Sequence, residues 1–168
     1  MAQAFMAHRR GEHAAARPLW EASLTISREV GNHTLATTQL VGIAICAFHA
    51  GEIQEALRIA LEALDEATDQ ENIPIASWVL DFVAAFAVSA APEEAVRLAG
   101  AVDSFRQEAG GGMELEPLEI EDARTVASRM LDPHELERSW TEGQTMTLEQ
   151  AVAYAREIER HVSSHPGP

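Results

Sequence analysis

Two fourteen-residue segments of this chain, 40 residues apart, share Gly, Glu, Ala and Leu at four matched positions. GEHAAARPLWEASL begins at Gly11 and GEIQEALRIALEAL begins at Gly51, and a weaker third copy begins at Ala90, 39 residues later. An alanine stands five residues after each of these starting positions, at Ala16, Ala56 and Ala95. Small residues at matched places let two helices approach closely at a tight turn. The repeat therefore predicts tandem helical hairpins that turn at Gly11, at Gly51 and near Ala90.

A period near 40 residues is typical of helical solenoids, in which each hairpin buries its open face on the next. The composition agrees, because 46% of the residues are hydrophobic and only 5% are aromatic, which favours helix over sheet. We expect an all-α fold of antiparallel helical hairpins stacked as a short right-handed solenoid and capped by C-terminal helices. The alternative is a non-repetitive helical bundle that reuses one favourable turn. The expected organisation is repeats over 1–110, capping helices over 111–162 and a disordered tail over 163–168.

Helix start and stop signals divide the chain further. Pro92 suits a first helical position, and two capping boxes are expected, one over 132–135 and one over 147–150. Pro18 lies about one turn inside its helix, so we expect a bend or a later helix start there. The large aromatic residues Trp20, Trp78 and Trp140 are expected to be structural.

The repeated phrase resembles the tetratricopeptide repeat, in a variant longer than the usual 34-residue unit. The C-terminal part resembles the last segment of large bacterial, actinobacterial-type regulators that join an ATPase core to a LuxR-like DNA-binding domain or a cyclase domain. That second resemblance rests on RLAGA at 97–101, WTEG at 140–143 and LEQAV at 148–152. It implies a non-catalytic tail that senses a signal or mediates oligomerisation, because no phosphate-binding loop and no DNA-reading helix is present.

Charge and hydropathy exclude several other functions. The formal charge is −15, from 27 acidic and 12 basic side chains, so nucleic acid would be repelled. The longest apolar run, residues 40–50, is shorter than the roughly 20 residues that a membrane-spanning helix needs. The first ten residues lack a signal-peptide layout, and we expect a cytoplasmic protein.

No catalytic, cofactor or metal site is expected. Cys46 lies on an apolar helix face, as a buried inert thiol does. Glu157, His161 and His165 share a helical spacing, but a frayed tail is the preferred interpretation there. The remaining five histidines are scattered at turns and caps. A hydrolase that uses the acidic segment around Glu119 and Glu121 is kept as an alternative, although the segment is most simply a solvated linker.

The expected binding surface is a concave groove lined by the first helix of each hairpin, which suits a peptide or an amphipathic helix. Its predicted residues are Thr38, Val41, Ile45, Phe48, His49, Ser77, Leu80, Asp81, Ala84 and Val88. Three alternatives remain open: the C-terminal helices fill the groove, the groove binds a small apolar effector, or a second copy of the chain docks. The second copy would dock at the N-terminal end, where the first helix is short and Phe5 and Met6 lack a neighbour.

Overall fold

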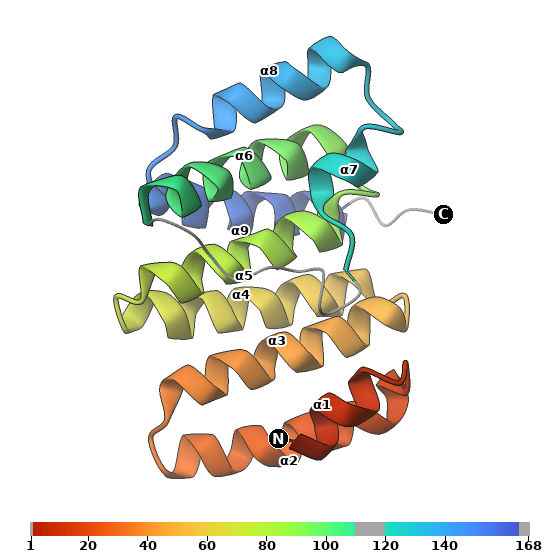
Figure 1. The fold of residues 1–168 in the computed structure, drawn as a ribbon, viewed down its shortest axis with the longest axis vertical. Coiled ribbons are helices and arrows are strands. Elements are labelled where there is room, and N and C mark those ends of the chain that lie inside the picture. The colour runs from red at the N-terminus through yellow and green to blue at the C-terminus, as the bar shows by residue number, and fades with distance from the viewer. Residues whose placement is uncertain (1, 110–119, 165–168) are drawn as a thin grey trace. The chain divides into compact units, whose positions relative to one another are not determined.

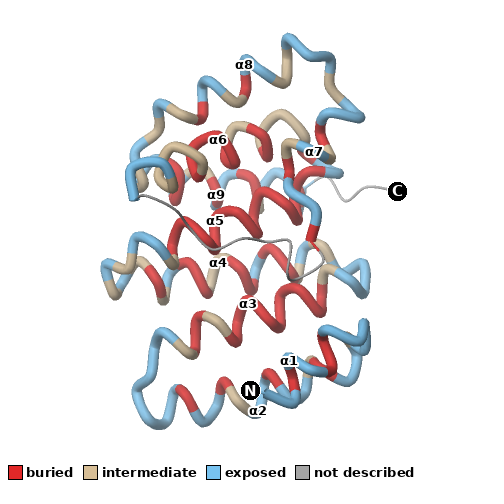
Figure 2. The backbone as a smooth tube through the Cα atoms, in the orientation of Figure 1, coloured by how far each residue is buried: buried red, intermediate tan, exposed pale blue. Residues whose placement is uncertain are grey.

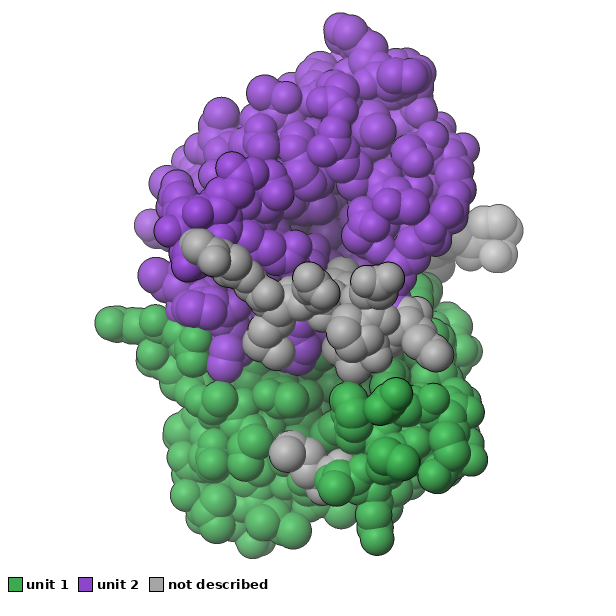
Figure 3. Space-filling model, viewed as in Figure 1, with its two compact units in different colours: residues 1–72 green, residues 73–168 purple. Residues whose placement is uncertain are grey.

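The computed structural model describes residues 2–109 and 120–164, and all regular structure within them is α-helical (Figure 1). The expected all-α class is confirmed. Backbone contacts divide the chain into two compact units, residues 1–72 and residues 73–168 (Figure 3), which we call unit 1 and unit 2. Each unit is described by itself.

Unit 1 consists of two helical hairpins in which consecutive helices pack against one another. Its helices are α1 (Ala2–His8), α2 (His13–Glu29), α3 (His33–His49) and α4 (Ile53–Asp69). Arginines of α2 form ion pairs with glutamates of α4. Arg28 lies 2.7 Å from Glu62 and 3.1 Å from Glu66. The second helices of the two hairpins therefore lie within side-chain reach of each other.

The repeated phrase forms the same hairpin turn twice. Gly11 and Gly51 have φ angles of 71° and 80°, in the left-handed region where glycine carries no Cβ penalty. After each glycine, the next backbone N–H donates to a carbonyl five residues earlier, from Glu12 to Ala7 at 3.0 Å and from Glu52 to Ala47 at 2.9 Å. This is the Schellman pattern of a helix C-terminus.

The three matched alanines occupy equivalent places. Ala16, Ala56 and Ala95 are each the fourth residue of the second helix of a hairpin, and each is fully buried. α2 begins at His13 and continues through Pro18, so a later helix start at that proline is wrong. Pro18 is exposed on α2, and water can hydrogen-bond to a carbonyl that loses its helical donor at an exposed position.

Unit 2 is organised around α6, which contacts the other four helices. The helices of this unit are α5 (Ile73–Ala87), α6 (Pro92–Ala109), α7 (Ala123–Ala127), α8 (Pro133–Gly143) and α9 (Leu148–Ser164). α5 is buried along most of its length (Figure 2), as expected for a helix that is apolar on almost every side.

The expected helix starts in unit 2 are present. Pro92 is the first residue of α6. Asp132 accepts from the backbone N–H of Glu135 at 3.0 Å, and the Glu135 side chain accepts from the Asp132 N–H at 3.3 Å, which completes the first capping box. Thr147 and Gln150 form the second box, with distances of 2.9 and 3.2 Å.

Some predictions about the C-terminal part differ from the structure, and others concern residues outside those that the structure describes. The short helix α7 lies in a segment taken as linker, and its signal is Asp122, whose side chain caps the helix at the N–H of Thr125. α9 runs to Ser164, so the first two residues of the predicted tail are helical. The expected boundary at residue 110 and residues 165–168 lie outside the described residues.

α6 and α8 cross at very close range. An added Cβ at Gly100 would lie 2.3 Å from the carbonyl oxygen of Trp140, and one at Gly143 would lie 1.8 Å from the carbonyl oxygen of Arg97. Each helix thus presents a glycine to the backbone of the other. The RLAGA and WTEG segments singled out from the sequence are the two sides of this crossing.

Candidate functional site

The α3 half of the predicted groove is mostly buried. Val41 and Ile45 are each 1% exposed, whereas Thr38 and Phe48 are half-buried and His49 is exposed. Of the predicted groove residues on α3, only these last three reach the surface. They do not form a continuous apolar wall in unit 1.

The α5 half of the groove is not a free surface. Ser77, Leu80, Asp81, Ala84 and Val88 are all buried. α7 and α9 pack against α5, which favours the alternative in which C-terminal helices cover this half. The physical reason is that a helix apolar on almost every side must be covered, so its would-be groove residues enter the core.

Asp81 is the charged member of that set, and it has a partner within unit 2. Its carboxylate forms an ion pair with Arg106 of α6. Burial raises the pKa of Asp81 above its ordinary value, and the nearby Arg106 acts in the opposite direction. The Asp81–Arg106 ion pair therefore links α5 to α6.

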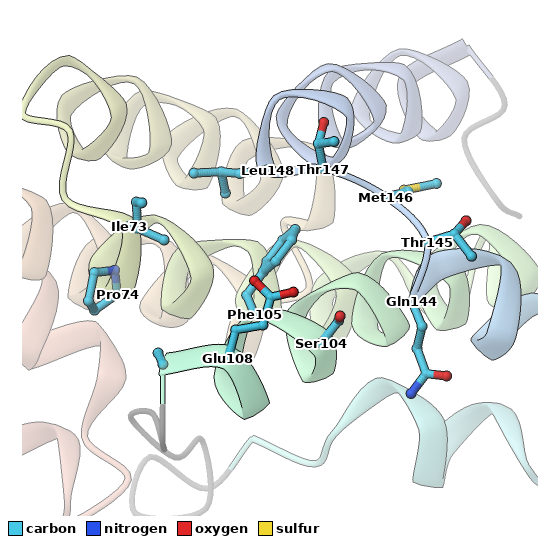
Figure 4. Close-up of a pocket in the computed structure, with 11 residues that line it drawn as sticks. Ile73, Pro74, Ser104, Phe105, Glu108, Gln144, Thr145, Met146, Thr147 and Leu148 are labelled. Atoms are coloured by element: carbon cyan, nitrogen blue, oxygen red, sulfur yellow. The ribbon is translucent and has the colours of Figure 1, made fainter.

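The structure instead places a pocket elsewhere in unit 2. It has a volume of about 650 Å³ and lies where the start of α5, the end of α6 and the α8–α9 connection converge (Figure 4). The ring of Phe105 projects from α6 into the space between Ile73 and the connection. Its lining residues are Ile73, Pro74, Ser104, Phe105, Glu108, Ala109, Gln144, Thr145, Met146, Thr147 and Leu148.

Hydrogen bonds within unit 2 hold the α8–α9 connection in place. The Gln144 side chain donates to the Asp103 carboxylate of α6 at 3.2 Å, and the Met146 N–H donates to the carbonyl of Gly143 at 2.9 Å. The capping box that starts α9 follows directly. The pocket wall is thus built from two helix ends and a connection with little freedom to move.

A second, shallower hollow of about 410 Å³ adjoins the pocket. Thr145 and Met146 line both hollows. In the second hollow, Arg97 donates to the Tyr154 hydroxyl at 2.7 Å and pairs with Glu142 at 2.7 Å. Burial raises the pKa of Tyr154, although Arg97 opposes the rise, so the hydroxyl stays protonated. We call the two hollows together the α8–α9 surface.

The titratable groups considered from the sequence lie only partly within the described residues. His161 Nδ1 lies 3.1 Å from a Glu94 carboxylate oxygen of α6, and His165 is outside the described residues. Of the acidic segment, Glu119 is also outside them, while Glu121 pairs with Arg129 at 2.5 Å. A hydrogen bond from Arg129 lowers the pKa of Glu121, as for a carboxylate in an ion pair.

One cluster was missed in the sequence. The structure brings together His8, His13 and Cys46, which had been treated as scattered histidines and an isolated thiol. The sequence signal that could have predicted this cluster is the position of these residues close to the two glycine turns. His8 and His13 flank Gly11, Cys46 and His49 precede Gly51, and equivalent turns of adjacent hairpins lie at the same end of a stack.

The aromatic residues expected to be structural differ in burial. Trp20 and Trp78 are each 5% exposed. Trp140 is half-buried and lies under the guanidinium of Arg124, whose central carbon is 4.2 Å from the ring centre.

None of the described helices is long and apolar enough to cross a bilayer.

Comparison with known proteins gives one similarity. The model of a tetratricopeptide repeat family matches residues 1–68, which are the two hairpins of unit 1. No match was found among curated proteins or among solved structures. Repeats of this family generally mediate protein–protein interaction and are typically non-catalytic. Residues 1–68 are therefore a tetratricopeptide-like domain.

Proposed function

We propose that the protein is a non-catalytic interaction module that binds a peptide segment of another protein on the α8–α9 surface. The observation that carries the interaction role is the tetratricopeptide match over residues 1–68. The location is supported by two adjoining hollows that share Thr145 and Met146. Apolar walls with a few polar groups are suited to one or two anchoring side chains.

The partner segment carries apolar side chains next to basic ones. Ile73, Phe105 and Leu148 supply apolar contact area in the larger hollow. Glu108 borders the larger hollow and Glu157 borders the smaller one. The formal charge of −15 adds long-range attraction for a basic segment.

The biological setting follows from the C-terminal resemblance. We place the module in the C-terminal part of a bacterial transcriptional regulator, where it senses a signal by recruiting a partner. The RLAGA, WTEG and LEQAV segments carry that resemblance; the first two form the α6–α8 crossing and the third begins α9.

A small apolar effector is the second candidate ligand for the same surface. The pocket volume of about 650 Å³ lies within the range of roughly 300–1,000 Å³ that small-molecule sites occupy. An effector would fill the larger hollow alone, whereas a peptide spans both hollows.

Peptide selection followed by affinity measurement tests the proposal. Purified protein is used to select from a displayed peptide library, and an enriched peptide is measured by fluorescence anisotropy. We expect apolar residues flanked by Lys or Arg. We expect Met146→Arg to weaken binding by about tenfold or more, since it puts a cation into both hollows.

Thr141→Arg is the matched control, because it adds the same charge on an exposed position of α8 that lines neither hollow. This variant is expected to bind within about twofold of the unmodified protein, and circular dichroism verifies that both variants are folded. Equal binding by the Met146→Arg and Thr141→Arg variants, or a selection without enrichment, contradicts the proposal. Binding of a small molecule, but of no peptide, in the larger hollow would support the effector instead.

A further inference from the structure

Three side chains with metal-binding atoms meet inside unit 1, away from the α8–α9 surface. His8 is the last residue of α1, His13 is the first residue of α2, and Cys46 lies on α3. One ligand atom from each lies within 4.8 Å of the other two. His8 and Cys46 are each only 3% exposed, and His13 is half-buried.

One atom of the cluster lacks the hydrogen bond that a buried nitrogen needs. His13 Nδ1 is shielded from solvent, and within the described part of the chain no hydrogen-bond partner reaches it. A buried polar atom without a partner costs about 1–3 kcal/mol. Coordination to a cation would satisfy this nitrogen.

The ring orientations allow the two histidines to share an ion. A metal lies in the plane of the imidazole that binds it, so two ligating rings need planes that intersect near the metal. The rings of His8 and His13 make a T-shaped contact, with centres 5.0 Å apart and an interplanar angle of 65°. Their planes therefore intersect.

His49 has a different role. Its ring stacks on His13 with centres 3.9 Å apart and an interplanar angle of 7°. Two nearly parallel planes at that separation do not contain a common ion, so His49 is not a ligand in this arrangement. It instead holds the His13 ring in its orientation.

The donor set selects the kind of metal. Two imidazole nitrogens and one thiolate suit Zn²⁺ and neighbouring transition metals, whereas Mg²⁺ and Ca²⁺ need carboxylate and carbonyl oxygens. In a tetrahedral zinc site, bond lengths of about 2.0–2.3 Å put ligand atoms roughly 3.3–3.6 Å apart. The ligand atoms of the three side chains lie within 4.8 Å of one another, so binding of the ion would draw them closer together.

We propose that His8, His13 and Cys46 bind one Zn²⁺ ion, with a fourth coordination position open to water or to another ligand. Binding forms two Zn–N bonds and one Zn–S bond and releases the thiol proton of Cys46 to solvent. The ion joins α1 and α2 to α3, so it stabilises the start of unit 1. The proposed peptide surface lies in unit 2, so the zinc site shares no residue with it.

Cobalt substitution tests the proposal on the full chain. Metal-free protein without an affinity tag is titrated with Co²⁺, and the thiolate-to-cobalt charge-transfer band in the near ultraviolet is recorded together with the visible bands of tetrahedral cobalt. We expect the absorbance to saturate at one equivalent of Co²⁺. The charge-transfer band and the visible bands should both disappear when Zn²⁺ is added. Zn²⁺ should also raise the thermal unfolding midpoint, because it binds only the folded arrangement.

Variants distinguish a built site from chance binding. Cys46→Ala should abolish the charge-transfer band, and His13→Gln should weaken Co²⁺ binding by at least about tenfold, in the range seen when metal-site residues are changed. His134→Gln is the control, because His134 lies exposed on α8 in unit 2. Circular dichroism verifies that each variant is helical.

Several results would overturn the assignment. These are no charge-transfer band at one equivalent, a band that persists in Cys46→Ala, equal affinities of His13→Gln and His134→Gln, or failure of Zn²⁺ to displace Co²⁺.

Discussion

At the scale of single residues, the closest backbone contacts in this protein depend on glycine. Gly100 and Gly143 let α6 and α8 approach until the backbone of each lies against the other. Alanine is otherwise the better helix former by about 1 kcal/mol. The lost helix propensity is therefore offset by the packing that the crossing permits.

Replacing either glycine should destabilise unit 2. We expect Gly100→Ala and Gly143→Ala each to lower the free energy of unfolding by about 1–3 kcal/mol, because backbone at the contact cannot rotate away as a side chain does. Urea denaturation followed by circular dichroism measures the change. Gly42→Ala is the comparison, since its Cβ would meet the Trp20 ring at 2.7 Å rather than a backbone atom. Unchanged stability of both Gly100→Ala and Gly143→Ala would show that the helices do not cross this closely.

Trp20 fills the space that Gly42 leaves open on α3, and it is 5% exposed. Trp20→Ala should reduce the free energy of unfolding by about 3–5 kcal/mol, because it removes a large buried ring and leaves a cavity. Trp140→Ala should cost less, since Trp140 is half-buried. Denaturant titration of the two variants gives the comparison, and an equal loss for both would contradict the burial of Trp20.

At the scale of helices and turns, local sequence signals and hydrogen bonds agree. Each capping box appears where its four residues predict it, because the required partners are neighbours in the chain. Turn geometry is equally local, and the Gly-Glu phrase closes both hairpins of unit 1 with the same bonds. Short helices such as α7 are harder to predict from the sequence. The single capping residue of α7 is difficult to recognise among the other acidic residues of its segment.

The Asp132 cap predicts a pH dependence of stability. Hydrogen bonds from the backbone N–H groups of Glu135 and His134 lower the pKa of Asp132 in the folded state. Its stabilising contribution is present above the ordinary aspartate value of about 3.9 and is lost as the pH falls through the lower folded value. We compare the free energy of unfolding of the unmodified protein with that of Asp132→Asn as the pH is lowered.

Asparagine accepts the same hydrogen bonds but does not titrate, so the advantage of the unmodified protein should shrink as the pH falls. Asp132→Ala removes the cap altogether and should be less stable than Asp132→Asn throughout. A difference between the unmodified protein and Asp132→Asn that does not change with pH would argue against the capping box.

At the scale of the whole molecule, the main feature is the excess of acidic over basic side chains. The chain carries 27 acidic and 12 basic side chains. Exposed ion pairs among the described residues, such as Arg10–Glu12 and Arg58–Glu55, are worth little individually. Repulsion among the excess carboxylates opposes compaction. Added salt therefore screens more repulsion than attraction.

We expect the thermal unfolding midpoint to rise when NaCl is increased from about 10 to about 200 mM, as the Debye length falls from roughly 30 to below 10 Å. Differential scanning calorimetry measures the midpoint, and sucrose of equal osmolality controls for non-electrostatic effects. A midpoint that falls with salt would show that the ion pairs outweigh the repulsion.

Self-association is a second property of the molecule. Phe5 and Met6 are 39% and 52% exposed on α1. If a second copy covers them, Met6→Lys should shift a dimer toward monomer, whereas Gln3→Lys on the same helix should not. Analytical ultracentrifugation over a range of concentrations measures this. A protein that stays monomeric throughout excludes the dimer.

The sequence by itself determined the all-α class, the hairpin turns of unit 1, the helix caps and the equivalent alanines, because each depends on residues close together in the chain. Only the tertiary structure decided which surfaces remain free. The predicted groove residues of the α5 segment are buried, and α6, α7 and α9 all pack against α5, whereas the α8–α9 surface arises where three separate segments converge. His8, His13 and Cys46 also meet only through packing. Which side chains become neighbours across helices depends on how far and at what angle the helices cross, and a glycine such as Gly143 sets that distance by contact with a carbonyl 46 residues away.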